Sequence, residues 1–240
     1  MVDLMTIEGE NLKGQPWQVY PRPQMRRNSY VNLNGNWELT GEGEESPFSI
    51  RVPFCPESKL SGIEYKDHMY SVWYKRTVNV DADKLRGNVL LHFGAVDYES
   101  HIYVNGNLAG NHFGGYSSFT IDVTSFLHEG ENDITVHAVD DTRNPNTPSG
   151  KQSTAYYSKG CSYTRTTGIW QTVWLEFVPK AYIKSAKYFP HIDDCSIDIE
   201  LELSQGGNVK VEAFYDEKPV GQAEKSVTSN YARLTLPLSE

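Results

Sequence analysis

The chain has 240 residues, of which 38% are hydrophobic and 22% are charged, so it can bury a core and is not a disordered polypeptide. Lys and Arg number 22 against 31 for Asp and Glu, a net charge of −9. This acidic balance excludes a nucleic-acid partner from our expectations, because phosphate backbones bind clustered cations. The length allows one large domain or two smaller ones, but not a β-domain together with a (β/α)8 barrel, which alone needs about 250 residues.

Membrane, metal and redox signals are weak throughout the sequence. No apolar run approaches the roughly 18 residues that span a bilayer, so we expect no membrane partner. The three cysteines, Cys55, Cys161 and Cys195, form no C-x-x-C pair, which predicts neither a disulfide framework nor a metal site. Acidic residues occupy the N-terminus where a signal peptide carries basic and then apolar residues. We therefore expect a cytoplasmic protein without metal or cofactor.

Period-two alternation predicts a series of short strands over the first three quarters of the chain. The dipeptide Asn105-Gly106 predicts a hairpin turn, because both central residues of a type I′ turn need positive φ. One helical turn is predicted, at 123–127 with Asp122 as its cap, and Trp73 and Trp174 are predicted core residues because they lie inside strands. The predicted strands cover 70–80, 89–93, 100–104, 119–122, 134–139 and 172–178. Many short strands separated by Gly, Pro and Asn indicate an all-β sandwich.

A long irregular segment, 140–167, interrupts this regularity. Compact domains rarely keep a loop above roughly 15 residues unless it has a function, so we look here first for a binding site. Asp140 and Asp141 lie where a core strand enters the loop, at the expected rim of a binding face. Tyr156 and Tyr163 lie within it and are candidates for stacking on sugar rings.

A second β-series follows Pro179. Its predicted strands cover 183–189, 196–203, 209–215, 220–227 and 233–236, with a turn at 216–219. An immunoglobulin-like sandwich needs about seven strands, so five indicate an incomplete domain with an open edge on its third strand. We expect the chain to be truncated at Glu240.

The common catalytic signatures are missing from the sequence. The segment 160–164 lacks the last glycine of a nucleophile elbow, and no glycine-rich phosphate-binding pattern is present. The acid pairs at 44–45, 140–141 and 193–194 are sequence neighbours, whose side chains point to opposite faces of a strand. They are therefore not ready acid and nucleophile pairs, and we expect no catalytic residue in this chain.

Several motifs in a fixed order resemble the opening of glycoside hydrolase family 2 enzymes. They begin with Pro-Arg-Pro-Gln-Met-Arg at 21–26 and Leu-Asn-Gly-Asn-Trp at 33–37, and continue through Gly-Ala-Val-Asp at 94–97 and Gly-Lys-Gln at 150–152. The similarity is tightest at Arg-Thr-Thr-Gly-Ile-Trp, 165–170. The resemblance implies a jelly-roll, galactose-binding-like sugar-binding domain at 1–179 and a truncated immunoglobulin-like domain at 180–240. It also implies that a catalytic barrel, which supplies both catalytic glutamates, follows in the parent enzyme and is absent here.

The resemblance also implies candidate contacts to a terminal sugar. The family position that carries an acidic residue before the Gly-Ile motif corresponds here to Ser162, a departure from the pattern. Lys151, Gln152 and Arg165 match family positions, and Asp67 lies roughly where another polar contact is found. For Arg165, pairing with a loop acid to hold the loop remains an equal alternative.

We therefore interpret the chain as the non-catalytic N-terminal part of a retaining exo-β-glycosidase, with the β-galactosidase type favoured. Its partners would be a terminal β-linked sugar and the barrel of the same polypeptide, and a homo-oligomer stays open. The isolated fragment is predicted to be inactive. Two alternatives remain: a stand-alone carbohydrate-binding module, and a structural or oligomerisation module that only supports a barrel.

Overall fold

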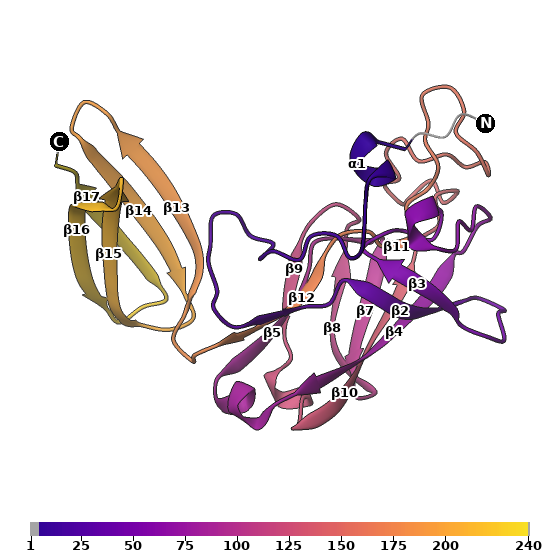
Figure 1. Cartoon of the computed structure of the whole chain (residues 1–240), viewed down its shortest axis with the longest axis horizontal. Helices are drawn as coiled ribbons and strands as arrows, with labels where there is room; N and C mark the ends of the chain where they lie inside the picture. The colour runs from indigo at the N-terminus through magenta and orange to yellow at the C-terminus, as the bar shows by residue number, and fades with distance from the viewer. Residues whose placement is uncertain (1–4, 240) are drawn as a thin grey trace. The chain divides into compact units, whose positions relative to one another are not determined.

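The computed structural model describes residues 5–239. They form two compact units with the boundary between Phe177 and Val178, and the strands of each unit are drawn in Figure 1. The architecture is all-β, as the sequence predicted. Within the described residues, no helix is long and apolar enough to cross a membrane.

The first unit is a sandwich of two main sheets. The six-stranded sheet has the order β3 (Phe48–Val52), β2 (Gly35–Gly41), β4 (Ser71–Val80), β10 (Gly130–Val139), β7 (Glu99–Val104) and β8 (Asn107–Phe113). The four-stranded sheet has the order β1 (Tyr30–Asn32), β12 (Val173–Val178), β5 (Asn88–Phe93) and β9 (Phe119–Asp122). A short pair, β11 (Gly168–Ile169) and β6 (Val96–Asp97), lies where the long loop ends.

The core of this unit follows from strand alternation. On β4, Val72 and Tyr74 are buried while Trp73 and Lys75 between and beyond them are exposed, because successive side chains point to opposite faces of the sheet. The same alternation runs along β2 and β10. The largest fully buried side chains, which include Tyr74, Phe93 and Ile134, form one cluster.

The prediction that Trp73 is a core residue is wrong. Its side chain is 41% exposed, whereas Trp174 is 4% exposed, as predicted. The indole of Trp73 lies on the outer face of the six-stranded sheet and stacks on His137 of β10, with ring centroids 4.1 Å apart. Both faces of this strand carry aromatic residues, so hydrophobicity alone did not determine which face is buried.

The structure has more helical turns than the sequence predicted. The predicted turn is a 3-10 turn, η3 (Thr124–Phe126), and the Asp122 carboxylate accepts the Thr124 N–H at 3.0 Å. The others are α1 (Ile7–Glu10), η1 (Lys59–Ser61) and η2 (Ala82–Arg86). Each is a short turn of three to five residues, too short to show a helical period in the sequence.

The predicted hairpin turn is present between β7 and β8. Asn105 and Gly106 have φ values of 51° and 77°, as a type I′ turn requires. The Asn105 side chain also donates to Asn132 Oδ1 at 2.8 Å and to the Phe126 carbonyl at 2.8 Å, so this turn is tied to the neighbouring loop.

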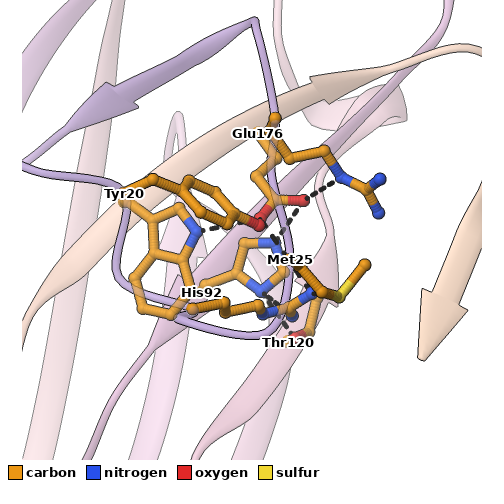
Figure 2. A network of polar contacts seen from close by, with 8 residues as sticks. Tyr20, Met25, His92, Thr120 and Glu176 are labelled. Carbon is orange, nitrogen blue, oxygen red and sulfur yellow. Dashed lines mark hydrogen bonds and ion pairs between the residues drawn. The ribbon is translucent and has the colours of Figure 1, made fainter. Parts of the chain in front are cut away.

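The outer face of the four-stranded sheet is covered by the N-terminal segment 17–27. All residues of β5 after Asn88 are buried, although a sheet face open to water would leave every second one exposed. Glu176 of β12, with a fully buried side chain, accepts hydrogen bonds from Tyr20 and from Arg27 Nε, the latter at 3.2 Å. Figure 2 shows how Tyr20, His92, Thr120 and Glu176 converge in this network. Its polar contacts hold the segment against the sheet.

The second unit has five strands. A three-stranded sheet has the order β13 (Ile183–His191), β14 (Ser196–Leu203) and β17 (Tyr231–Pro237), and β15 (Gly207–Tyr215) pairs with β16 (Lys218–Val227). Alternate residues of β14 and β17 form a separate core cluster with Val209 of β15. The turn between β15 and β16 is shorter than predicted, because only Asp216 and Glu217 lie outside the strands.

Candidate functional site

A group of buried polar side chains lies at the base of the long loop. We call Glu57, Asp97, Asp140, Gln152 and Arg165 the polar centre; each is buried. They come from distant parts of the chain. Glu57 follows β3, Asp97 ends β6 and Asp140 directly follows β10, while Gln152 and Arg165 belong to the loop itself.

Hydrogen bonds fix two of the three carboxyl groups. Glu57 accepts the Thr167 hydroxyl at 2.6 Å and the Thr167 N–H at 3.3 Å. Gln152 Nε2 donates to Asp97 Oδ2 at 2.8 Å, and Gln152 Oε1 accepts the Thr166 N–H at 2.7 Å. The amide of Gln152 therefore links Asp97 to the end of the loop.

Two glycines allow this close packing. A Cβ at Gly115 would lie 2.1 Å from Asp97 Oδ1, so any other residue would displace the carboxylate. Gly168 pairs with Asp97 across β11 and β6 and has a φ of 70°. A Cβ there would lie 2.5 Å from the Tyr74 hydroxyl, which explains the glycine of the Gly-Ile motif on steric grounds.

The three carboxyl groups share one poorly solvated environment. Burial, together with the charges of Asp97 and Glu57, raises the pKa of Asp140 to about 7. Burial also raises the pKa of Asp97 to about 6 and raises the pKa of Glu57. Asp97 Oδ1 and Asp140 Oδ2 are buried without a hydrogen-bond partner among residues 5–239. Since buried polar atoms are normally paired, these two oxygens set the polar centre apart from the rest of the core.

The guanidinium of Arg165 hydrogen-bonds to backbone carbonyls and not to a carboxylate. Its Nη1 donates to the Ala155 carbonyl at 2.6 Å, and its Nη2 donates to the carbonyls of Lys66 and Asp67. These bonds join the loop to the segment before β4. The alternative that Arg165 pairs with a loop acid is replaced by bonds to backbone carbonyls. The buried Nε of Arg165 has no hydrogen-bond partner in the described part of the chain.

The structure brings some predicted site residues together and leaves others apart. Asp140, Gln152 and Arg165 meet in the polar centre. Lys151 is exposed beside Gln152, and the half-buried Ser162 lies in a tight turn with Lys159. The carboxylates of Asp67 and Asp141 instead accept backbone N–H groups, of His68 at 2.7 Å and of Arg143 at 3.0 Å.

The loop tyrosines form an exposed aromatic surface. Tyr156, Tyr157 and Tyr163 each expose about half of their surface, between 48% and 57%. Tyr156 packs edge-on against His68, with ring centroids 5.4 Å apart, and His68 stacks on Tyr70. These rings are open to a ligand and are not part of the core.

Sequence reasoning missed Glu57 and Asp97 as site residues. Asp97 ends an otherwise apolar run, Ala95-Val96, in the middle of the family resemblance, and a carboxylate at the end of a buried strand was the available signal. Glu57 is 110 positions from its partner Thr167, so only the folded chain reveals its role. Within the described ranges, no group of three or more His, Cys, Asp or Glu side chains could hold a metal ion.

Comparisons with known proteins agree with this architecture. Residues 17–179 match the model of the glycosyl hydrolases family 2 sugar binding domain. A protein of Formosa agariphila named "Putative beta-glucuronidase" is 38% identical over 216 residues, covering 82% of this chain and 25% of that protein. A β-galactosidase of Thermoanaerobacter pseudethanolicus is 32% identical over 145 residues, covering 59% of this chain and 18% of that protein. The chain thus spans a quarter or less of the length of these curated relatives.

The fold is also similar to solved structures. A β-glucuronidase from Ruminococcus gnavus, in complex with C6-substituted uronic isofagomine, aligns with a TM-score of 0.70 at 16% identity. The alignment covers 93% of this chain and 41% of that chain.

Proposed function

Because this chain belongs to glycoside hydrolase family 2, we propose that it is the sugar-binding part of a retaining exo-β-glycosidase. In this proposal the catalytic barrel belongs to the same polypeptide outside this chain. The barrel supplies the two carboxyl groups, about 5 Å apart, that retaining hydrolysis through a covalent glycosyl-enzyme intermediate needs. The present chain binds and orients the terminal sugar.

The observation that carries the proposal is the polar centre. It combines unpaired buried oxygens on Asp97 and Asp140 with a fixed amide at Gln152, beneath a loop with exposed tyrosines. Polar atoms that lack partners inside the described chain and aromatic rings at the rim are what recognition of sugar hydroxyls and sugar faces requires.

The charges of the polar centre favour a neutral sugar. Three buried carboxyl groups would repel the carboxylate of a glucuronide. Arg165, the cation of the polar centre, uses its Nη donors on backbone carbonyls. With pKa values raised to about 7 and about 6, Asp140 and Asp97 carry protons for part of the time near neutral pH and can then donate to hydroxyls. We therefore favour a β-galactoside as the substrate.

A β-glucuronide is the second candidate, since a relative that matches most of this chain carries that name. The test is a calorimetric titration of the chain with methyl β-galactopyranoside and with methyl β-glucuronide at pH 7. We expect the galactoside to bind at least about fivefold more tightly, a difference of about 1 kcal/mol. Tighter binding of the glucuronide would overturn the galactoside assignment in favour of the second candidate.

A further inference from the structure

A cleft lies apart from the polar centre, on the covered face of the four-stranded sheet. Its volume is about 730 Å³, within the range of small-molecule sites. Residues of the N-terminal segment form one wall, among them Trp17, Arg22 and Gln24, and Trp170 and Gln171 form part of the other. None of the five residues of the polar centre lines it.

The walls of this cleft are fixed before any ligand arrives. Asn32 Nδ2 donates to the Trp17 carbonyl at 2.7 Å. Arg22 Nη2 lies 2.9 Å from His92 Nδ1, and its guanidinium lies over the ring of Trp174. Burial lowers the pKa of His92, so its neutral ring accepts from Arg22 while its Nε2 lies 3.4 Å from Glu176. Figure 2 shows this network, which anchors the wall. A preorganised site loses little entropy on binding.

The side chains at the cleft have the chemistry of a sugar site. Trp17 is 62% exposed at the rim, and Trp170 is half-buried with its indole N–H donated to the Gly115 carbonyl at 2.7 Å. Indole rings offer flat apolar surfaces for the C–H face of a pyranose. The amides of Gln24 and Gln171 supply donors and acceptors for hydroxyl groups.

We propose that this cleft is a second pyranose-binding site, in addition to the polar centre. The ligand class rests on the proposed sugar-binding function, but the residues are different. Trp170 lies between the two sites, because its N–H bonds to Gly115, which packs against Asp97. A glycan can therefore be held at two places on the same unit.

The test is a titration of the ¹⁵N-labelled chain with methyl β-galactopyranoside, followed through the indole N–H signals of its five tryptophans. Methyl β-glucuronide forms a second arm, which distinguishes a neutral pyranose from an acidic one that pairs with Arg22. We expect saturable shifts of the Trp17 and Trp170 signals with at least one sugar. Trp17→Ala and Gln171→Ala should each weaken this binding about fivefold or more. Trp73→Ala, which removes an exposed indole from the other sheet, is the matched control and should leave it unchanged.

The outcomes separate the two sites. Saturable shifts that survive in Gln152→Ala but weaken in Trp17→Ala support the cleft. Unchanged affinity in both Trp17→Ala and Gln171→Ala overturns it. Binding that is lost in Gln152→Ala alone also overturns the cleft and leaves the polar centre as the sugar site. The absence of saturable shifts at Trp17 and Trp170 with either sugar overturns the cleft as well, and the polar centre is then judged from the effect of Gln152→Ala.

Discussion

Asp140 lies directly after β10, 5% exposed, with its carboxyl group beside those of Asp97 and Glu57. Its raised pKa has a defined consequence for stability. Because the folded pKa of about 7 exceeds the ordinary value of 3.8, the native state binds more protons than the unfolded state between these values. The free energy of unfolding therefore falls as the pH rises from about 4 to about 7.

Asp140→Asn should remove this part of the pH dependence, because the amide has a similar shape and no charge. Relative to the wild type, we expect the free energy of unfolding of the variant to be about 1–3 kcal/mol higher at pH 8 and unchanged at pH 4. Urea denaturation at both pH values measures the difference, with Asp193→Asn, an exposed acid, as the control. An equal change at both pH values would contradict the assignment.

The pKa of Glu176 is shifted in the opposite direction from that of Asp140. Burial alone would raise its pKa, but the His92 ring beside it and hydrogen bonds from Tyr20 and Trp174 hold the pKa well below the ordinary value of 4.5. Its contribution to stability is therefore present above pH 4.5 and is lost as the pH falls through the folded pKa.

Glu176→Gln should remove the buried negative charge that faces Arg27 and destabilise the first unit by about 2–4 kcal/mol at pH 7. Thermal unfolding followed by circular dichroism measures the loss. Glu212→Gln, which breaks an exposed pair with Lys210, should leave the melting temperature unchanged. Equal effects of the two substitutions would show that the network does not hold the N-terminal segment.

At the scale of elements, period-two alternation predicted the positions of the strands well. The site was harder to predict, because its residues lie far apart in the sequence. The strand at 196–203 and the strand at 119–122 lie where the period-two pattern predicted them, because one face of each packs on a core. The polar centre was only partly predictable: Asp140 and Gln152 lie in the long loop, whose length drew attention to it. Glu57 joins the site only because the fold brings it next to Thr167, 110 positions away. No local sequence pattern predicts this contact.

Trp37 and Trp73 lie on neighbouring strands of the six-stranded sheet but point to opposite faces, so they can be compared directly. Trp37 on β2 is 2% exposed and donates its indole N–H to the Leu33 carbonyl at 2.8 Å, whereas Trp73 stacks on His137 at the surface. Trp37→Ala should cost about 3–5 kcal/mol of unfolding free energy, and Trp73→Ala less than about 1.5 kcal/mol. Comparable losses in urea denaturation would place Trp73 in the core after all.

At the scale of the whole molecule, a sugar-binding unit and a second β-unit together span a quarter or less of the curated relatives. Two of the buried carboxyl groups are committed to the chain's own structure, with Glu57 bonded to Thr167 and Asp97 bonded to Gln152. We therefore propose sugar binding, and not hydrolysis, as the role of the polar centre.

The chain alone should release no 4-nitrophenolate from 4-nitrophenyl β-galactopyranoside above the uncatalysed rate, because in our proposal the barrel outside this chain supplies both catalytic carboxyl groups. Absorbance of the released phenolate measures this directly. Hydrolysis by the purified chain that disappears in Asp140→Asn would show that the polar centre is itself catalytic.

Binding of the sugar by the polar centre is tested most directly by calorimetry with methyl β-galactopyranoside at pH 7. We predict saturable binding by the wild type and by Lys159→Ala, an exposed loop control. Gln152→Ala, which frees Asp97 from its amide partner, should bind at least about fivefold more weakly. Equal affinity of Gln152→Ala and the wild type, or no binding by the wild type, would contradict this role of the polar centre.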